Sequence, residues 1–92
     1  MRAERDIALC AVADAGIRSK VMNAMIQKRI PYAEEWHKVP LLRRRKYEGA
    51  KEVCIIVTHH DQADQAKAQI QAMDDVVSSR VYFDLKGLTG LS

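Results

Sequence analysis

Two apolar runs of strand length dominate the hydrophobic pattern of the chain. The run at 53–57 is rich in β-branched residues, follows Gly49, and is apolar at both alternating sets of positions. The run at 7–13 is also continuous, and the sequence Asp14-Ala15-Gly16 ends it. A strand that is apolar on both alternating sets is covered on both faces. The pattern therefore predicts two central strands of a small sheet.

Helical periodicity follows the first run. From Ile17 onward the apolar residues form a broad stripe of the kind that packs on a sheet. Asp14 or Ser19 could cap the first turn, because their side-chain oxygens accept a free backbone N–H. Pro31 cannot continue a helix. We predict a helix from about residue 15 to 29.

A second helix is predicted after the run at 53–57. Asp61 is a good N-cap, and a narrow apolar stripe follows it at steps of three and four: Ala63, Ala66, Ile70, Met73 and Val77. Asp74 and Asp75 are unfavourable at the negative end of a helix dipole. The second helix is therefore expected to end near Met73.

Two further strands are predicted, one on each side of this helical pattern in the chain. Residues 32–48 are mixed in polarity, and Pro40 cannot donate to a ladder, which indicates an edge strand. We expect a long edge hairpin there, with the basic residues 43–46 at its tip or far arm. Residues 77–85 alternate between apolar and polar, which predicts a last strand with one covered face.

The predicted order is strand, helix, edge strand, central strand, helix, strand. With right-handed crossovers this is the ferredoxin-like βαββαβ fold, an α+β fold with a four-stranded antiparallel sheet and two helices on one face. Its first and third strands are central, which agrees with the two doubly apolar runs. We expect one domain over 1–92, with a core at about 6–86 and a C-terminal tail at 87–92.

Composition indicates a small globular domain. The chain has 92 residues, 48% of them apolar, and a net charge of +3. Chains this short are often stabilised by oligomerisation, so we expect a homo-oligomer. The charged N-terminus and the interrupted apolar run after it resemble neither a signal peptide nor a membrane span, which predicts a cytoplasmic protein without membrane contact. Cys10 and Cys54 lie inside apolar runs and are predicted to be buried free thiols.

The basic residues provide a candidate anion site. They form two groups, one in the predicted hairpin and one at the start of the first helix: Arg43, Arg44, Arg45 and Lys46, and Arg18, Ser19 and Lys20. A helix N-terminus offers free N–H donors to a phosphate, and arginine adds bidentate pairing. Two alternatives stay open, namely an ordinary solvated basic loop and a surface for a polyanion.

Three other functions are weaker. Weak metal candidates are His37, His59 and His60, but adjacent histidines on a strand point to opposite faces, so a metal would require a site between subunits. The two central runs lack the aromatic residues on which ferredoxin-like RNA binders stack bases, so sequence-specific nucleic-acid binding is disfavoured. No nucleophile has a base at a recognisable spacing, and we expect no enzymatic activity.

The layout resembles the small trimeric ferredoxin-like proteins of the PII and CutA group. Four features carry the resemblance: the basic connection 39–49, its end Tyr47-Glu48-Gly49, the strand 52–57, and the sequence Arg80-Val81-Tyr82-Phe83-Asp84 followed by Lys86-Gly87-Leu88-Thr89-Gly90. In that group the connection and the segment after the last strand meet at a subunit cleft that binds an adenine nucleotide. The resemblance implies a trimer, with Arg43 to Lys46, Lys86, Thr89 and Gly90 at the cleft.

These observations favour a non-enzymatic, oligomeric sensor that binds a small anion, such as an adenine nucleotide, at a subunit interface. Anion binding would order the arginine-rich hairpin and change the protein partner that it contacts. One alternative is an interaction module that pairs through the edge strand near residues 32–42. The other is an intersubunit metal-binding protein that uses the three histidines.

Overall fold

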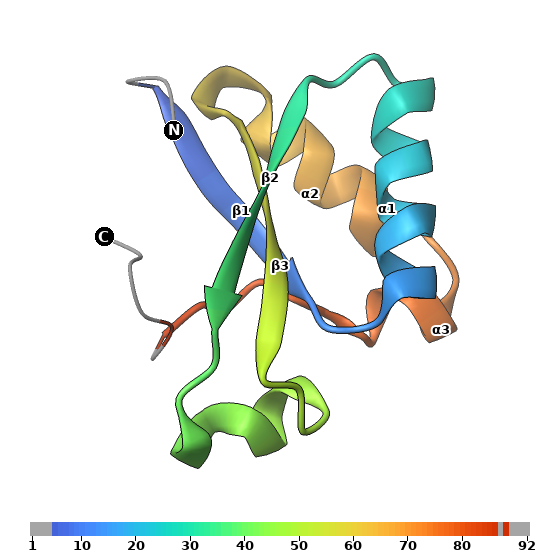
Figure 1. The fold of residues 1–92 in the computed structure, drawn as a ribbon. Coiled ribbons are helices and arrows are strands. Elements are labelled where there is room, and N and C mark those ends of the chain that lie inside the picture. Colours follow the sequence, from blue (N-terminus) through green and yellow to red (C-terminus); the bar gives the residue numbers. More distant parts are fainter. Residues whose placement is uncertain (1–4, 87, 89–92) are drawn as a thin grey trace.

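The computed structural model describes residues 5–86 and 88 and has an α+β architecture (Figure 1). The elements in chain order are β1 (Asp6–Val12), α1 (Ala15–Gln27), β2 (Tyr32–Lys38), the 3-10 helix η1 (Leu41–Tyr47), β3 (Glu52–His59), the 3-10 turn η2 (His60–Gln62), α2 (Ala63–Gln71), α3 (Asp75–Ser78) and β4 (Val81–Tyr82). The four strands form one antiparallel sheet in the order β2-β3-β1-β4. The two doubly apolar runs are its central strands, as predicted.

The sheet separates two clusters of buried residues. Cys54 and Ile56 of β3 face the cluster that contains the buried side chains of α1 and α2, and both helices lie on that side of the sheet (Figure 1). Ile55, between them in sequence, faces the opposite cluster, which Tyr47 of η1 covers. Because residues 53–58 of β3 are all buried, the prediction that this strand is covered on both faces is confirmed.

Helix α1 begins where the sequence predicts. Asp14 is its N-cap, and its carboxylate accepts the N–H of Ile17 at 2.9 Å. The helix buries the stripe formed by Ile17, Val21, Ala24 and Met25. It ends at Gln27, two residues earlier than predicted, because Arg29 turns the chain with a φ of 55°. A residue in the left-handed region is a common helix terminator.

The predicted edge hairpin is wrong in its second half. Strand β2 is an edge strand as expected, but the basic run after Pro40 forms the 3-10 helix η1. Proline has a fixed φ and favours the start of a turn, and the carbonyl of Pro40 accepts the N–H of Arg43 at 2.8 Å. Tyr47 is fully buried and docks this segment against the sheet. Glu48 and Gly49, with φ of 61° and 78°, return the chain into β3.

In the C-terminal half the predicted N-cap of the second helix is wrong, whereas the predicted end of that helix is close to the observed one. Asp61 is not the N-cap of α2, because it lies inside η2, where its N–H bonds to the ring of His59 at 3.3 Å. The predicted end near Met73 lies within two residues of the observed one, but the pattern does not predict the short helix that follows. Helix α2 ends at Gln71, and Asp74 caps a new helix, α3, by accepting the N–H of Val77 at 3.1 Å. As a result Val77 is helical and β4 is shortened to Val81–Tyr82.

The thiol prediction is confirmed, because Cys10 and Cys54 are both buried and free. Within residues 5–86 and 88, no helix has the length and apolar character needed to cross a membrane. Most of the predicted tail 87–92, including Thr89 and Gly90, lies outside the described residues.

Candidate functional site

The basic residues of the predicted hairpin lie on a short docked helix, which we call the basic arm (residues 41–47). Arg43 and Arg45 are exposed, whereas Arg44 is half-buried. The Nε of Arg44 donates to the carbonyl of Val39 at 3.2 Å, which holds its guanidinium beside the end of β2. The arm lies below one end of the sheet, between β2 and β3 in the chain (Figure 1). Its charges therefore have defined positions on the fold.

A shallow depression of about 480 Å³ lies between the arm and the sheet. Its lining consists of Lys38, Arg44, Lys51 and Glu52. Lys38 and Glu52 face each other across β2 and β3, and the chain passes from the arm to β3 through Lys51. Three cations and one carboxylate give this surface a net positive charge. Within the described part of the chain, none of these four side chains forms a salt bridge. Such a surface attracts anions.

Lys46 and Tyr47 attach the arm to the segment after β4. The Nζ of Lys46 donates to the carbonyl of Asp84 at 2.7 Å and lies 3.3 Å from its carboxylate. The hydroxyl of Tyr47 donates to the same carbonyl at 3.1 Å. The N–H of Lys86 and the ammonium of Lys46 hold the pKa of Asp84 below its ordinary value. Lys46 therefore acts mainly as a tether, although the sequence suggests an anion contact.

A network of carboxylates joins the arm to the start of α1. Glu48 accepts hydrogen bonds from the guanidinium of Arg80 and, at 2.9 Å, from the hydroxyl of Tyr82. Arg80 also lies 3.5 Å from Asp14, the N-cap of α1. The ring of Tyr82 meets that of Tyr47 edge-on, with 5.2 Å between centroids. Burial, followed by the bond to Glu48, raises the pKa of Tyr82 to about 12.

Because of this network, the two halves of the predicted anion site do not form one site. The basic arm and the first turn of α1 are linked through Arg80, but the groups that Arg80 joins are the carboxylates Asp14 and Glu48. These negative charges disfavour an anion at the junction. The depression, whose lining includes neither Asp14 nor Glu48, is therefore the better candidate.

Arg18 is held by residues of its own chain. Its guanidinium lies 2.5 Å from a carboxylate oxygen of Glu34 on β2 and 5.4 Å from the ring centroid of Trp36. The same oxygen of Glu34 accepts the thiol of Cys54 at 3.3 Å. The Nε of Arg18 is buried and has no hydrogen-bond partner among the described residues. An anion would have to compete with Glu34 for this guanidinium.

The remaining predicted anion contacts are scattered. Ser19 and Lys20 are exposed on α1, away from the side chains that line the depression. Lys86 is exposed, and its N–H bonds to the carboxylate of Asp84 at 3.1 Å. Thr89 and Gly90 fall outside the described residues, so of the tail residues that the resemblance places at the cleft only Lys86 is described.

The histidines occupy two separate places. His37 on β2 lies 3.1 Å from Glu35 of the same strand. His59 and His60 both flank Asp61, at 3.7 and 3.3 Å. Among the described residues no group of three metal-ligating side chains occurs. A metal site that combines two subunits stays a prediction.

Comparison of the chain with protein-family models, with curated proteins and with solved structures finds no match. The resemblance to the PII and CutA group therefore stays a hypothesis. The function has to be inferred from the geometry of the chain itself.

Proposed function

We propose that this chain is a ferredoxin-like, non-enzymatic, oligomeric module that binds a small phosphate-bearing ligand in the depression beside the basic arm. The proposal is carried by one observation: Lys38, Arg44 and Lys51 line a common depression that contains a single carboxylate, Glu52. The strand order β2-β3-β1-β4 supports the ferredoxin-like assignment, because it places the first and third strands at the centre.

The chemistry of the depression suits an anionic group such as a phosphate. A guanidinium offers paired N–H donors that match two phosphate oxygens, and lysine contributes a point charge. Arg44 is held in place by the carbonyl of Val39 at 3.2 Å, so less of its conformational freedom is lost when a ligand binds. The volume of about 480 Å³ is in the range of small-molecule sites, typically about 300–1,000 Å³. An adenine nucleotide is the first ligand to test.

Because the basic arm is already folded, the ligand is expected to act on it in a different way from the one that the sequence predicts. The sequence predicts that the ligand orders a flexible hairpin, but Tyr47 already docks the arm as a 3-10 helix. We therefore propose that the ligand acts by neutralising the positive surface and adding its own groups beside Arg43 and Arg45, both of which are exposed. A protein partner that recognises the arm would then bind differently with and without the ligand.

The test is a calorimetric titration of the wild-type protein with ATP, with inorganic pyrophosphate and with adenosine. We expect the two phosphate compounds to bind and adenosine to bind much more weakly. A variant of the depression, Lys38→Gln/Arg44→Gln/Lys51→Gln, should lose at least about tenfold in affinity, since each charge-assisted bond contributes about 1.5–3 kcal/mol.

A matched control removes the same charge elsewhere. The variant Lys28→Gln/Arg43→Gln/Arg45→Gln also loses three cations, and none of these residues lines the depression. It should retain most of the wild-type affinity. Equal losses in the two variants would indicate a diffuse polyanion surface, and no binding of either phosphate compound to the wild type would refute the proposal.

A further inference from the structure

We infer that β2 pairs with β2 of a second copy of this chain, antiparallel, with Trp36 on the two-fold axis. The two sheets would join into one continuous sheet. The occupant of the free edge is thus another identical chain, and the contact closes at two subunits because it is isologous. This pairing rests on the free edge of β2 and not on anion binding at the basic arm, although the two proposals share Lys38, which also lines the depression.

Strand β2 has a free edge. It is the outermost strand of the sheet, and among the described residues it pairs only with β3, in a regular register over Tyr32–Lys38. The backbone groups of an edge strand that point away from the sheet can pair with another strand. Seven residues without a bulge are long enough for a stable ladder to a partner.

The structure identifies which residues point outward. Val39 donates its N–H to the carbonyl of Lys51 on the β3 side at 2.8 Å. Backbone groups alternate in direction along an antiparallel strand, so residues 33, 35 and 37 also bond toward β3. The N–H and C=O groups of Glu34, Trp36 and Lys38 therefore point to the free edge. In a pairing of two copies, these residues must lie opposite one another.

This constraint leaves few registers, and one of them matches the charges. When Trp36 lies opposite its own copy, Glu34 faces the Lys38 of the second copy, and the reverse pair forms as well. On the other face, Glu35 faces the His37 of the second copy. A shift by two residues in either direction removes both of these Glu34–Lys38 pairs, because it places Trp36 opposite Glu34 or opposite Lys38, and one of the two shifts also places Glu35 opposite Glu35. Opposite charges across strands are favourable and like charges are not.

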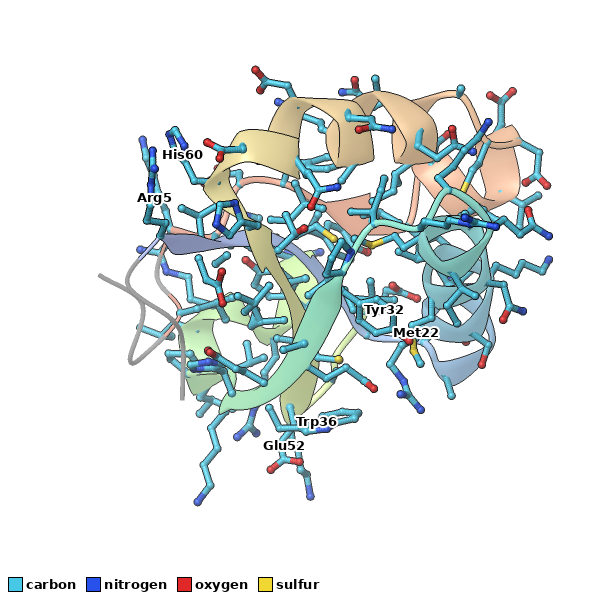
Figure 2. The ribbon with its side chains drawn as sticks, turned by 90° about the horizontal axis from the view of Figure 1, so that it is seen from above. Arg5, Met22, Tyr32, Trp36, Glu52 and His60 are labelled. Carbon is cyan, nitrogen blue, oxygen red and sulfur yellow. The ribbon has the colours of Figure 1, made fainter. Side chains whose placement is uncertain are left out.

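Trp36 fits the centre of such an interface. Its side chain is 57% exposed although it is the one tryptophan of the chain, and it lies at the outer margin of the molecule (Figure 2). Exposed tryptophans in interfaces often contribute much of the binding energy. The ring of Trp36 lies 5.4 Å from the guanidinium of Arg18, so it is partly preorganised.

The ladder has a natural end. In the proposed register Tyr32 would lie opposite Pro40, which has no N–H to donate. The hydrogen-bonded pairs are thus those of Trp36 with itself and of Glu34 with Lys38. Charged edge residues commonly protect a strand from pairing. Here Glu34 and Lys38 carry opposite charges and lie two positions on either side of Trp36. They therefore attract each other in this register and disfavour the shifted ones.

The first test exchanges charges and measures association by sedimentation equilibrium. The wild type should be a dimer that dissociates on dilution. Lys38→Glu and Glu34→Lys should each weaken the dimer about tenfold or more, because each reversal makes two favourable pairs repulsive. An equimolar mixture of the two variants should restore wild-type association, since both pairs are again opposite in charge. A monomer, a trimer, or a wild-type dimer insensitive to the reversals would overturn the pairing.

The second test does not depend on Glu34, which also contacts Arg18 and Cys54 inside the chain. In the proposed register the two Cα atoms of residue 36 are about 5.5 Å apart, which suits a disulfide. Those of residue 38 are separated by about four residues along the strand, or about 14 Å. Mild oxidation should cross-link Trp36→Cys and leave Lys38→Cys monomeric on a non-reducing gel. Equal cross-linking, or cross-linking of Lys38→Cys alone, would overturn the register.

Discussion

Replacement of Tyr47 tests whether the basic arm is an integral part of the fold. Tyr47 is fully buried in the second cluster, where it packs with Ile55 of β3 and meets the ring of Tyr82 edge-on. Its hydroxyl donates to the carbonyl of Asp84 at 3.1 Å. Tyr47→Ala removes the ring and this bond, whereas Tyr47→Phe removes the bond alone. The two variants therefore separate packing from hydrogen bonding.

The expected costs differ clearly. Truncation of a buried aromatic residue to alanine costs about 3–5 kcal/mol. The loss of one neutral hydrogen bond costs about 0.5–1.5 kcal/mol. For Tyr47→Phe the low end is expected, because the carbonyl of Asp84 keeps the ammonium of Lys46 at 2.7 Å as a partner. A chain of 92 residues has a stability of roughly 5–14 kcal/mol, so Tyr47→Ala should remove a large part of it.

Urea unfolding, followed by circular dichroism and by the fluorescence of Trp36, measures both costs. Trp36 is the single tryptophan of the chain and reports on β2, and coincident transitions would show that arm and sheet unfold together. Tyr47→Ala should lower the midpoint far more than Tyr47→Phe. A Tyr47→Ala variant within about 1 kcal/mol of the wild type would refute the docking of the arm, because the loss of a packed aromatic costs more.

Two further predictions concern titratable groups. Burial raises the pKa of the Cys10 and Cys54 thiols to about 12. A thiol reagent at pH 8 should therefore modify neither cysteine in the folded protein and both cysteines after unfolding. Rapid labelling of the native protein would contradict their burial. The N–H of Ile17, followed by Arg80, holds the pKa of Asp14 below its ordinary value of 3.8, so the stability it contributes is present above that pH and lost as the pH falls through the lowered value. Asp14→Asn, which can still cap α1, should reduce this loss in acid urea titrations, and an unchanged acid dependence would show that Asp14 does not contribute to it.

The central strands could be predicted because the signal is local and strong. A run such as 53–57 is apolar on both alternating sets, and its short length, its β-branched residues and the preceding Gly49 favour a strand between two covered faces. Asp14 is one of the two N-cap candidates that the sequence offers for α1, and the structure has Asp14 in that role, since a cap acts on residues three positions away. Both predictions agree with the structure.

The predictions fail where one residue fits two different elements of secondary structure. Asp74 is unfavourable at the end of a helix, but the same carboxylate is a good N-cap for the next helix, and it caps α3. Val77 fits both the helical stripe and the alternating pattern of a last strand. The structure assigns it to α3, where it is fully buried. Local periodicity cannot decide between two patterns that share a residue.

The candidate site shows the same limit at longer range. The cluster of cations is evident in the sequence, but its geometry depends on partners far along the chain: Arg18 pairs with Glu34 sixteen positions away, and Tyr47 bonds to Asp84 at a separation of 37. The first contact removes Arg18 from the predicted anion site. The second turns a basic loop into a docked arm.

A basic run therefore becomes a defined site only when a neighbouring residue anchors it. Arg43 to Arg45 alone would be compatible with a solvated loop, the alternative that the sequence leaves open. Tyr47 has no charge and does not line the depression, yet its burial places Arg44 beside Lys38 and Lys51. Loss of the Tyr47 ring should thus weaken anion binding without the removal of any cation. That result would distinguish a binding site with a fixed geometry from a diffuse positive surface. Anion binding to a diffuse surface depends on the number of cations and not on how the arm is docked.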